Sequence, residues 1–265
     1  MIRTIVKSCI PIFGSVLPKA AKQKLWQGYK FLYVKTFDSA FYQRIFNRRV
    51  DSLSKEVLQQ AFQQDSDYEA YVNCQIEKSL LMVTRAPQGW GLGERTVGLV
   101  GFMQQVLPST DQPARVLCVG CRNGAELDYI EETCNATTQG LDLFSQDNRI
   151  TVGDMHAMPF ANDSFDVVYS CHSLEHAFDI KQAISEFYRL ARPEGIIAIE
   201  IPIKYELSDT DRWDVGSVSG LLEHFGSQSH EVLKQETSDE HVRVVIRVRK
   251  LARKTTSNVK SASTR

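Results

Sequence analysis

The pattern of hydrophobic and polar residues changes near Pro113. From about residue 25 to 84, aromatic and aliphatic side chains recur every three or four positions with few glycines or prolines, which predicts helices. After Pro113, short apolar runs alternate with helical stretches, which is typical of a parallel sheet covered by helices. The runs that predict strands are RVLCVG, TQGLDL, RITVGD, FDVVYS and GIIAIEIP.

Further elements follow from the same pattern. One proline and three glycines at 87–93 predict a loop before a helix at 94–106. Residues 179–195 predict a helix with one apolar face that ends near Pro193. HEVLKQET and HVRVVIRVRK flank the polar turn 238–240 and predict a closing antiparallel hairpin. Only about six residues, 144–149, separate the second and third strands, too few for a helical crossover.

Composition fits a folded globular protein. The chain has 265 residues, of which 43% are hydrophobic and 24% charged. We expect a basic, aromatic helical region at 1–88, an α/β domain at 89–251 and a disordered basic tail at 252–265.

The charge is unevenly distributed. Residues 1–50 carry ten lysines and arginines against one acid, a net charge of +9, and residues 241–265 carry +8. One interpretation is peripheral contact of residues 1–50 with an anionic membrane. The other is a solvated helix face and a flexible tail. Nucleic-acid binding is not favoured, because no compact basic cluster is interleaved with aromatic residues.

The chain's N-terminal residues and cysteines favour a reduced, cytoplasmic protein. The first apolar stretch is interrupted by Lys7 and Pro11, so it predicts neither a membrane-spanning helix nor a cleaved signal. Six cysteines are thinly spread, unlike a disulfide framework. They are Cys9, Cys74, Cys118, Cys121, Cys134 and Cys171.

The strongest chemical signal is VLCVGCRNGAELDYI, a strand, a glycine-bearing loop and a helix. At Gly120 and Gly124 the backbone can approach a ligand closely, and the helix directs free amides toward it. Asp142 ends the next strand, 22 residues after Gly120, where a carboxylate can accept the hydroxyls of a ribose.

Two more candidates end the third strand. Asp154 can hydrogen-bond an adenine amino group, and Met155 can pack against its ring. Ligands of parallel sheets bind outside the carboxyl ends of the strands, so Gly120, Asp142 and Asp154 describe one crevice. Each acid taken alone would also fit an ordinary turn.

Residues of about 115–202 resemble the class I S-adenosylmethionine-dependent methyltransferases, in the small-molecule subgroup with the LEH signature. The matching segments, in the family's order, are VLCVGCRNG, GLDLF, GDMHAMPFANDSFDVVYSCHSLEH and EFYRLARPEGIIAIEIP. The resemblance implies a Rossmann-like α/β fold with a mostly parallel seven-stranded sheet whose last strand is antiparallel, and S-adenosylmethionine as cofactor. The cofactor-binding residues it implies are Gly120, Cys121, Arg122, Gly124, Asp142, Leu143, Asp154, Met155 and Ser170.

The chain departs from the family at three points. Cys118 stands where the family usually has an acid, and Arg122 where it has a glycine. Arg122 either contacts the cofactor carboxylate or points to solvent. The missing helix after the second strand is expected to leave the adenine side more open.

Three other motif interpretations are weaker. Cys118 and Cys121 form C-x-x-C, but Cys118 lies within a strand, where a thiol is buried and inert. The glycine loop lacks the middle glycine of a nicotinamide-binding motif. HSLEH at 172–176 matches the H-x-x-E-H zinc pattern, yet it directly follows a strand and suggests no distant third ligand.

His172 and His176 are the candidate general bases, His172 first. Glu175 and His176 could instead hold a divalent metal, or only cap the helix and pair with each other. The acceptor is expected to be a small molecule, glycan or lipid-like compound that is O-methylated. Its pocket is expected from the N-terminal helices, Trp90, Tyr205, Asp211 and Trp213. The alternative function is a non-catalytic binding or scaffold protein of the same fold, favoured by Cys118 and Arg122.

Overall fold

The computed structural model describes residues 66–85, 92–121, 124–145 and 147–250. The chain divides into two units, 1–52 and 53–265, and the described residues all belong to the second. The expectations for residues 1–50, the Trp90 loop, Arg122 and the tail at 252–265 therefore lie outside the described residues, and the predicted domain boundaries stay predictions.

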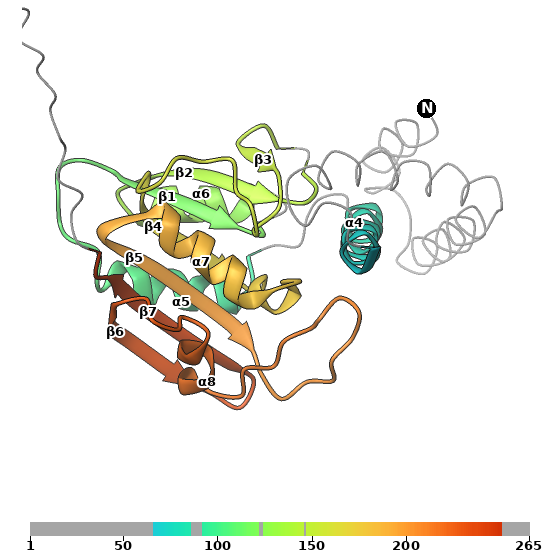
Figure 1. Ribbon diagram of the computed structural model, residues 1–265. Coiled ribbons are helices and arrows are strands. Elements are labelled where there is room, and N and C mark those ends of the chain that lie inside the picture. Colours follow the sequence, from blue (N-terminus) through green and yellow to red (C-terminus); the bar gives the residue numbers. More distant parts are fainter. Residues whose placement is uncertain (1–65, 86–91, 122–123, 146, 251–265) are drawn as a thin grey trace, which may run out of the picture. The chain divides into compact units, whose positions relative to one another are not determined.

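A seven-stranded sheet forms the centre of this unit (Figure 1). Its strand order is β3-β2-β1-β4-β5-β7-β6, and β7 runs antiparallel to β5 and β6 while the β1 to β5 neighbours pair in parallel. This confirms the predicted Rossmann-like fold. The strands are β1 Ala114–Val119, β2 Ala136–Asp142, β3 Ile150–Val152, β4 Phe165–Cys171, β5 Ala191–Pro202, β6 His230–Thr237 and β7 His241–Val248.

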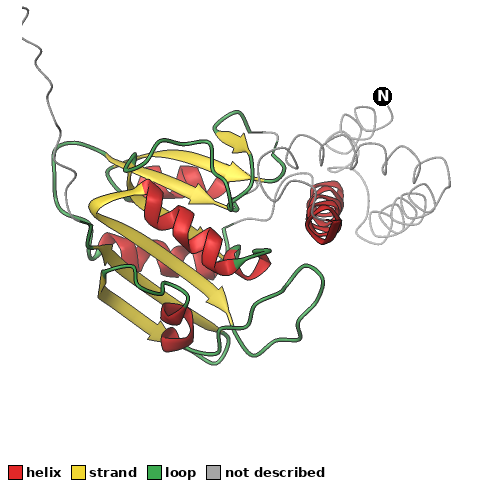
Figure 2. Ribbon diagram, in the orientation of Figure 1, coloured by secondary structure: helices red, strands yellow, loops and turns green. Residues whose placement is uncertain are grey.

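Helices cover both faces of the sheet (Figure 2). α5 and α6 pack on one hydrophobic core, and α7 and α8 pack on the other. Within the described ranges no helix is both long and apolar enough to cross a membrane. The helical segments are α4 Ser66–Arg85, α5 Glu94–Gln104, α6 Ala125–Thr133, the 3-10 turn η1 Leu174–His176, α7 Ile180–Leu190 and α8 Val218–Glu223.

The central strands are apolar on both sides because both faces are covered. In β1, Leu117 belongs to the core under α7, whereas Val116 and Cys118 belong to the core under α5 and α6. All three are fully buried. This double burial is why the strand reads as a continuous apolar run instead of an alternating one.

α7 begins where the sequence predicts but ends at Leu190, before the expected end near Pro193, because Ala191 already pairs in β5. The side chain of Asp179 caps it by accepting hydrogen bonds from the backbone amides of Lys181 and Gln182. β5 starts earlier than predicted, at Ala191, which pairs with Phe165. The intervening residues bulge out before regular pairing resumes at Ile196, so the sequence shows only the later part as a strand.

The connection between β2 and β3 is short, as predicted. β2 ends at Asp142 and β3 begins at Ile150, and the residues described between them form no helix. Arg149 fastens this connection to α6 by donating hydrogen bonds to Asp147 at 2.9 Å and to Asp128 at 2.7 Å.

Candidate active site

A cleft lies at the carboxyl ends of the parallel strands, the side toward which β1, β2 and β5 point in Figure 1. Its free volume is about 60 Å³, room for about two water molecules. A nucleoside can therefore enter only if neighbouring side chains or α4 shift. The cleft is lined by Tyr71, Gln75, Ser79, Val119, Gly120, Leu141, Asp142, Leu143, Gly153, Asp154, Met155, His172, Ser173 and His176.

Gly120 turns the chain at the end of β1. Its φ is +80°, and its amide donates a 2.7 Å hydrogen bond to the carbonyl of Leu141 in β2. A Cβ atom at this position would lie 2.2 Å from the Cβ of Ser173. The fold therefore requires glycine here, independently of any ligand.

Asp142 is the last residue of β2 and Leu143 follows it; both side chains are half-buried in the cleft. Oδ1 of Asp142 accepts a 3.1 Å hydrogen bond from the amide of Phe144. This local bond holds the carboxylate at the strand end, where it lines the cleft together with Gly120.

Asp154 is buried at the next strand end and already has strong partners. The hydroxyl of Tyr68 donates to Oδ2, and His156 contacts Oδ1 with its ring and, at 2.9 Å, with its backbone amide. Burial by itself raises the pKa of Asp154, but the hydrogen bonds from His156 and Tyr68 outweigh it and hold the pKa below its ordinary value. The carboxylate predicted to meet adenine is thus also the anchor of α4.

α4 supplies one wall of the cleft through Tyr71, Gln75 and Ser79. Gln75 donates a 2.8 Å hydrogen bond to the carbonyl of Thr210 in the segment after β5, and Lys78 pairs with Asp211 at 3.1 Å. The sequence predicted that N-terminal helices would reach the acceptor pocket without identifying these residues. The feature of the sequence that could have identified them is the presence of two polar residues, Gln75 and Ser79, on an otherwise apolar face of the helix.

The two candidate bases both line the cleft, with different partners. Nε2 of His172 lies 3.2 Å from Oε1 of Glu200, and its amide donates to the Glu200 carbonyl at 2.9 Å. Nδ1 of His176 donates to the carbonyl of Thr210 at 2.7 Å and lies 3.1 Å from Oδ1 of Asp211. The hydrogen bond from His176 is the main reason that the pKa of Asp211 lies well below its ordinary value.

Glu175 lies beside these histidines but does not line the cleft. It is 3% exposed, and burial raises its pKa. Its Oε1 is 3.7 Å from Nε2 of His176, while Oε2 has no hydrogen-bond partner within the described part of the chain. His172 precedes the short turn η1 instead of sharing a helix with His176. The geometry of a helical H-x-x-E-H zinc motif is therefore not formed.

The sequence matches the methyltransferase domain family over residues 117–199, the segment that supplies the whole cleft lining except the α4 wall. Residues 117–199 thus belong to a methyltransferase domain. It is 31% identical over 91 residues to malonyl-[acyl-carrier protein] O-methyltransferase 1 of Coxiella burnetii, a match covering 32% of each protein. It is 26% identical over 185 residues to phosphoethanolamine N-methyltransferase 1 of Triticum aestivum, covering 58% of this chain and 37% of that protein.

A solved methyltransferase shares the fold. The 1,6-didemethyltoxoflavin-N1-methyltransferase of Burkholderia thailandensis, in complex with its substrate and S-adenosylhomocysteine, superposes with a TM-score of 0.55 at 13% identity. The match covers 69% of this chain and 90% of that one. The chain spans only about a third of the length of the first curated relatives.

The other predicted cofactor residues of the methyltransferase domain are placed less directly. Gly124 is the N-cap of α6, and Met155 lines the cleft beside Asp154. Ser170 is fully buried and absent from the cleft lining, with its Oγ 2.7 Å from Oγ of Ser173. Cys121, which directly follows Gly120 in the glycine loop, is also buried.

The C-x-x-C pair of the methyltransferase domain consists of free thiols. Cys118 is fully buried. The thiol of Cys121 donates a 3.4 Å hydrogen bond to the backbone carbonyl of Cys118. Burial raises the pKa of both thiols well above the ordinary value, so neither forms a thiolate readily. The predicted burial of Cys118 within the strand is confirmed.

Of the residues expected around the acceptor, Tyr205 and Trp213 are engaged within their own segment. The hydroxyl of Tyr205 donates to the carbonyl of Trp213, whose Nε1 donates to the carbonyl of Ala177 at 2.7 Å. Neither lines the cleft, and Asp211 reaches it only through its bond to His176.

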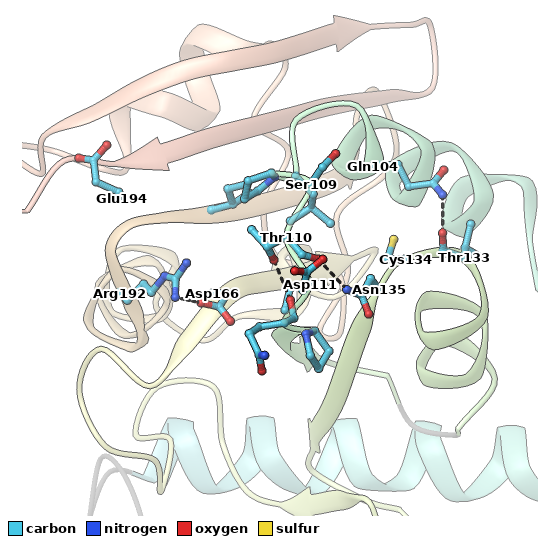
Figure 3. Close-up of a pocket in the computed structure, with 16 residues that line it drawn as sticks. Gln104, Ser109, Thr110, Asp111, Thr133, Cys134, Asn135, Asp166, Arg192 and Glu194 are labelled. Atoms are coloured by element: carbon cyan, nitrogen blue, oxygen red, sulfur yellow. Dashed lines mark hydrogen bonds and ion pairs between the residues drawn. The ribbon is translucent and has the colours of Figure 1, made fainter.

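A larger cavity of about 700 Å³ lies at the opposite end of the methyltransferase sheet (Figure 3). The α5–β1 loop at 107–113 and the start of β5 enclose it. Three of its charged side chains are paired within the protein: Arg192 pairs with Asp166, and Glu194 pairs with Arg249. Ligands of open parallel sheets bind at the carboxyl ends of the strands, so we assign the active site to the smaller cleft.

Proposed function

We propose that the protein is an S-adenosylmethionine-dependent methyltransferase that methylates a hydroxyl group of a small-molecule, glycan or lipid-like acceptor. The observation that carries this proposal is that Gly120, Asp142, Asp154 and His172 line a single cleft. They follow four different strands and lie far apart in the sequence, which makes their convergence informative.

The residues of the cleft fit the chemistry of the cofactor. Gly120 and Gly153 leave the backbone open to close approach, and Leu143 and Met155 offer apolar surface to an adenine ring. The carboxylate of Asp142 can accept hydrogen bonds from both ribose hydroxyls. Asp154 and the backbone beside it can hydrogen-bond the polar edge of the adenine ring once the Tyr68 hydroxyl leaves the Asp154 carboxylate or shares it with the ligand.

The relatives support methyl transfer more strongly than any one acceptor. Their names include O-methyltransferases of malonyl-[acyl-carrier protein] and tocopherol as well as N-methyltransferases. O-methylation is favoured here because His172, a side chain that can act as a general base, lines the cleft, and a hydroxyl acceptor must lose a proton.

Bound S-adenosylmethionine would supply an activated methyl group on a sulfonium sulfur. The cleft would hold the acceptor oxygen in line with that group and exclude water, so that positioning provides most of the acceleration. His172 receives the proton of the acceptor hydroxyl.

The test is calorimetric titration of the full chain with S-adenosylhomocysteine. Asp142→Asn keeps an oxygen that can accept the Phe144 amide, so the turn is preserved while the charged ribose acceptor is lost. We expect about 2 kcal/mol weaker binding, about thirty-fold in Kd. The matched control is Asp166→Asn in the larger cavity, which should bind like the wild type.

Two outcomes would contradict the proposal. Loss of binding in Asp166→Asn but not in Asp142→Asn would move the site to the larger cavity. Absence of binding to the wild-type protein would defeat the enzyme assignment and favour the non-catalytic binding protein. Binding lost only in Asp142→Asn would justify screening hydroxyl acceptors.

A further inference from the structure

Glu200 is a charged residue in the middle of the sheet. It lies in β5 between its neighbours Cys171 of β4 and Arg243 of β7, and its side chain is 0% exposed. A buried ion pair rarely stabilises a fold more than well-packed apolar residues would. The position of Glu200 next to the cleft therefore calls for an explanation beyond packing.

Glu200 holds His172 at two points. Its carbonyl accepts the His172 amide at 2.9 Å, and its Oε1 lies 3.2 Å from Nε2 of the ring. His172 has a φ of +50°, a left-handed conformation that a non-glycine residue adopts only when its surroundings enforce it. The strained backbone turns the ring into the cleft lining and back onto this carboxylate.

Glu200 is itself held in place by Arg243. Nε of Arg243 donates to Oε2 of Glu200 at 2.6 Å, and Nη1 donates to Glu236 at 2.7 Å. The guanidinium lies 5.0 Å from the centre of the Phe102 ring of α5. A Cβ at Gly98 would lie 2.3 Å from Nη2, so glycine at this position of α5 makes room for the arginine.

The charge state of this group determines which ring nitrogen is basic. Burial raises the pKa of Glu200, but hydrogen bonds from His172 and Arg243 outweigh it, and the pKa lies below its ordinary value. An ionised carboxylate only accepts hydrogen bonds, so Nε2 of His172 must carry a proton. The lone pair of the neutral ring is then on Nδ1, which has no hydrogen-bond partner in the described ranges.

We propose that Glu200 is a positioning residue that, clamped by Arg243, orients His172 and fixes its Nε2–H tautomer, leaving Nδ1 as the base of the reaction. This inference rests on the proposed function only for the role of the base. The tautomer and the carboxylate contact can be tested without knowing the acceptor.

The experiment is ¹⁵N–¹H NMR of the histidine rings in the full chain across a pH titration, with the signals of His172 assigned from His172→Gln. We expect the Nε2–H tautomer when the ring is neutral. In Glu200→Gln the midpoint of the His172 titration should fall by about one pH unit or more, because an opposite charge near the ring is lost. Glu126 from α6 and Glu175 from η1 also act on the ring and remain in both proteins.

Glu236→Gln is the matched control, since Glu236 contacts Arg243 without touching His172, and it should leave the midpoint unchanged. An Nδ1–H tautomer in the wild type would overturn the proposal even if Glu200→Gln did not fold. So would an unchanged midpoint in a folded Glu200→Gln. Binding of S-adenosylhomocysteine to the wild-type protein, measured alongside, tests the proposed function separately. Failure of that binding in the wild type would instead count against the proposed function.

Discussion

Replacing Gly120 by alanine should destabilise the protein by about 2–4 kcal/mol. A left-handed conformation costs an alanine about 1–2 kcal/mol. The new Cβ would lie 2.2 Å from the Cβ of Ser173, far inside normal carbon contact, and relieving such overlap costs about 1–3 kcal/mol. The unfolded chain loses some entropy with alanine, which returns about 0.4–1 kcal/mol.

The assay is equilibrium urea unfolding of the full chain followed by circular dichroism, with the free energy taken from the midpoint and slope. Gly101→Ala is the matched control, because a Cβ there meets nothing within 4 Å and Gly101 lies inside α5. It should stabilise the protein by up to about 1 kcal/mol through helix propensity.

A second variant separates the two costs. Ser173→Gly removes the atom with which the new Cβ collides. The double variant Gly120→Ala with Ser173→Gly should therefore be about 1–3 kcal/mol more stable than the sum of the single effects predicts, while the cost of the backbone conformation remains. Strict additivity, or a cost below about 1 kcal/mol for Gly120→Ala, would refute this reasoning. Because replacing Gly120 is expected to destabilise the fold itself, loss of ligand binding in a Gly120 variant is no evidence that Gly120 contacts the ligand.

Two further predictions concern α4 and α6. Tyr68→Phe should lower the free energy of unfolding by about 1.5–3 kcal/mol, because buried Asp154 loses a charge-assisted hydrogen bond; wild-type urea stability in this variant would mean that the contact does not anchor α4. Burial raises the pKa of Glu126 from 4.5 to about 7, so the folded state binds the proton more tightly and stability should fall as pH rises from 4.5 to 7. Glu126→Gln should flatten that decline in urea midpoints measured across this range, and an equally steep decline would show that another group causes it.

The fold of the sheet was predictable because its strands carry local signals. The apolar run of β1 reflects burial on both faces of the sheet. The alternation in HVRVVIRV was enough to predict β7, although residues 242–246 are all buried. The missing helix before β3 followed from counting the residues between Asp142 and Ile150. The start of β5 was placed too late because its first pair, Ala191 with Phe165, depends on a partner strand.

The position of α4 could not be predicted, for a different reason. Tyr68 and Asp154 are 86 residues apart, and periodicity identifies the apolar face of a helix without identifying what it covers. The pairing of Glu200 with Arg243 also needed the antiparallel register of β5 and β7. Its only signal in the sequence was a glutamate inside the apolar run GIIAIEIP, a local inconsistency of the kind that often marks a functional position.

The two histidines of the cleft are not equivalent as candidate bases. His176 donates Nδ1–H to a backbone carbonyl, so its basic nitrogen is Nε2, which lies 3.7 Å from a glutamate whose pKa is raised by burial. Its other partner, Asp211, is also the partner of Lys78, which ties His176 to the placement of α4. His172 instead contacts a fully buried carboxylate fixed within the sheet. A base must keep its geometry if α4 shifts when a ligand binds, and of the two histidines only His172 is held by the sheet itself.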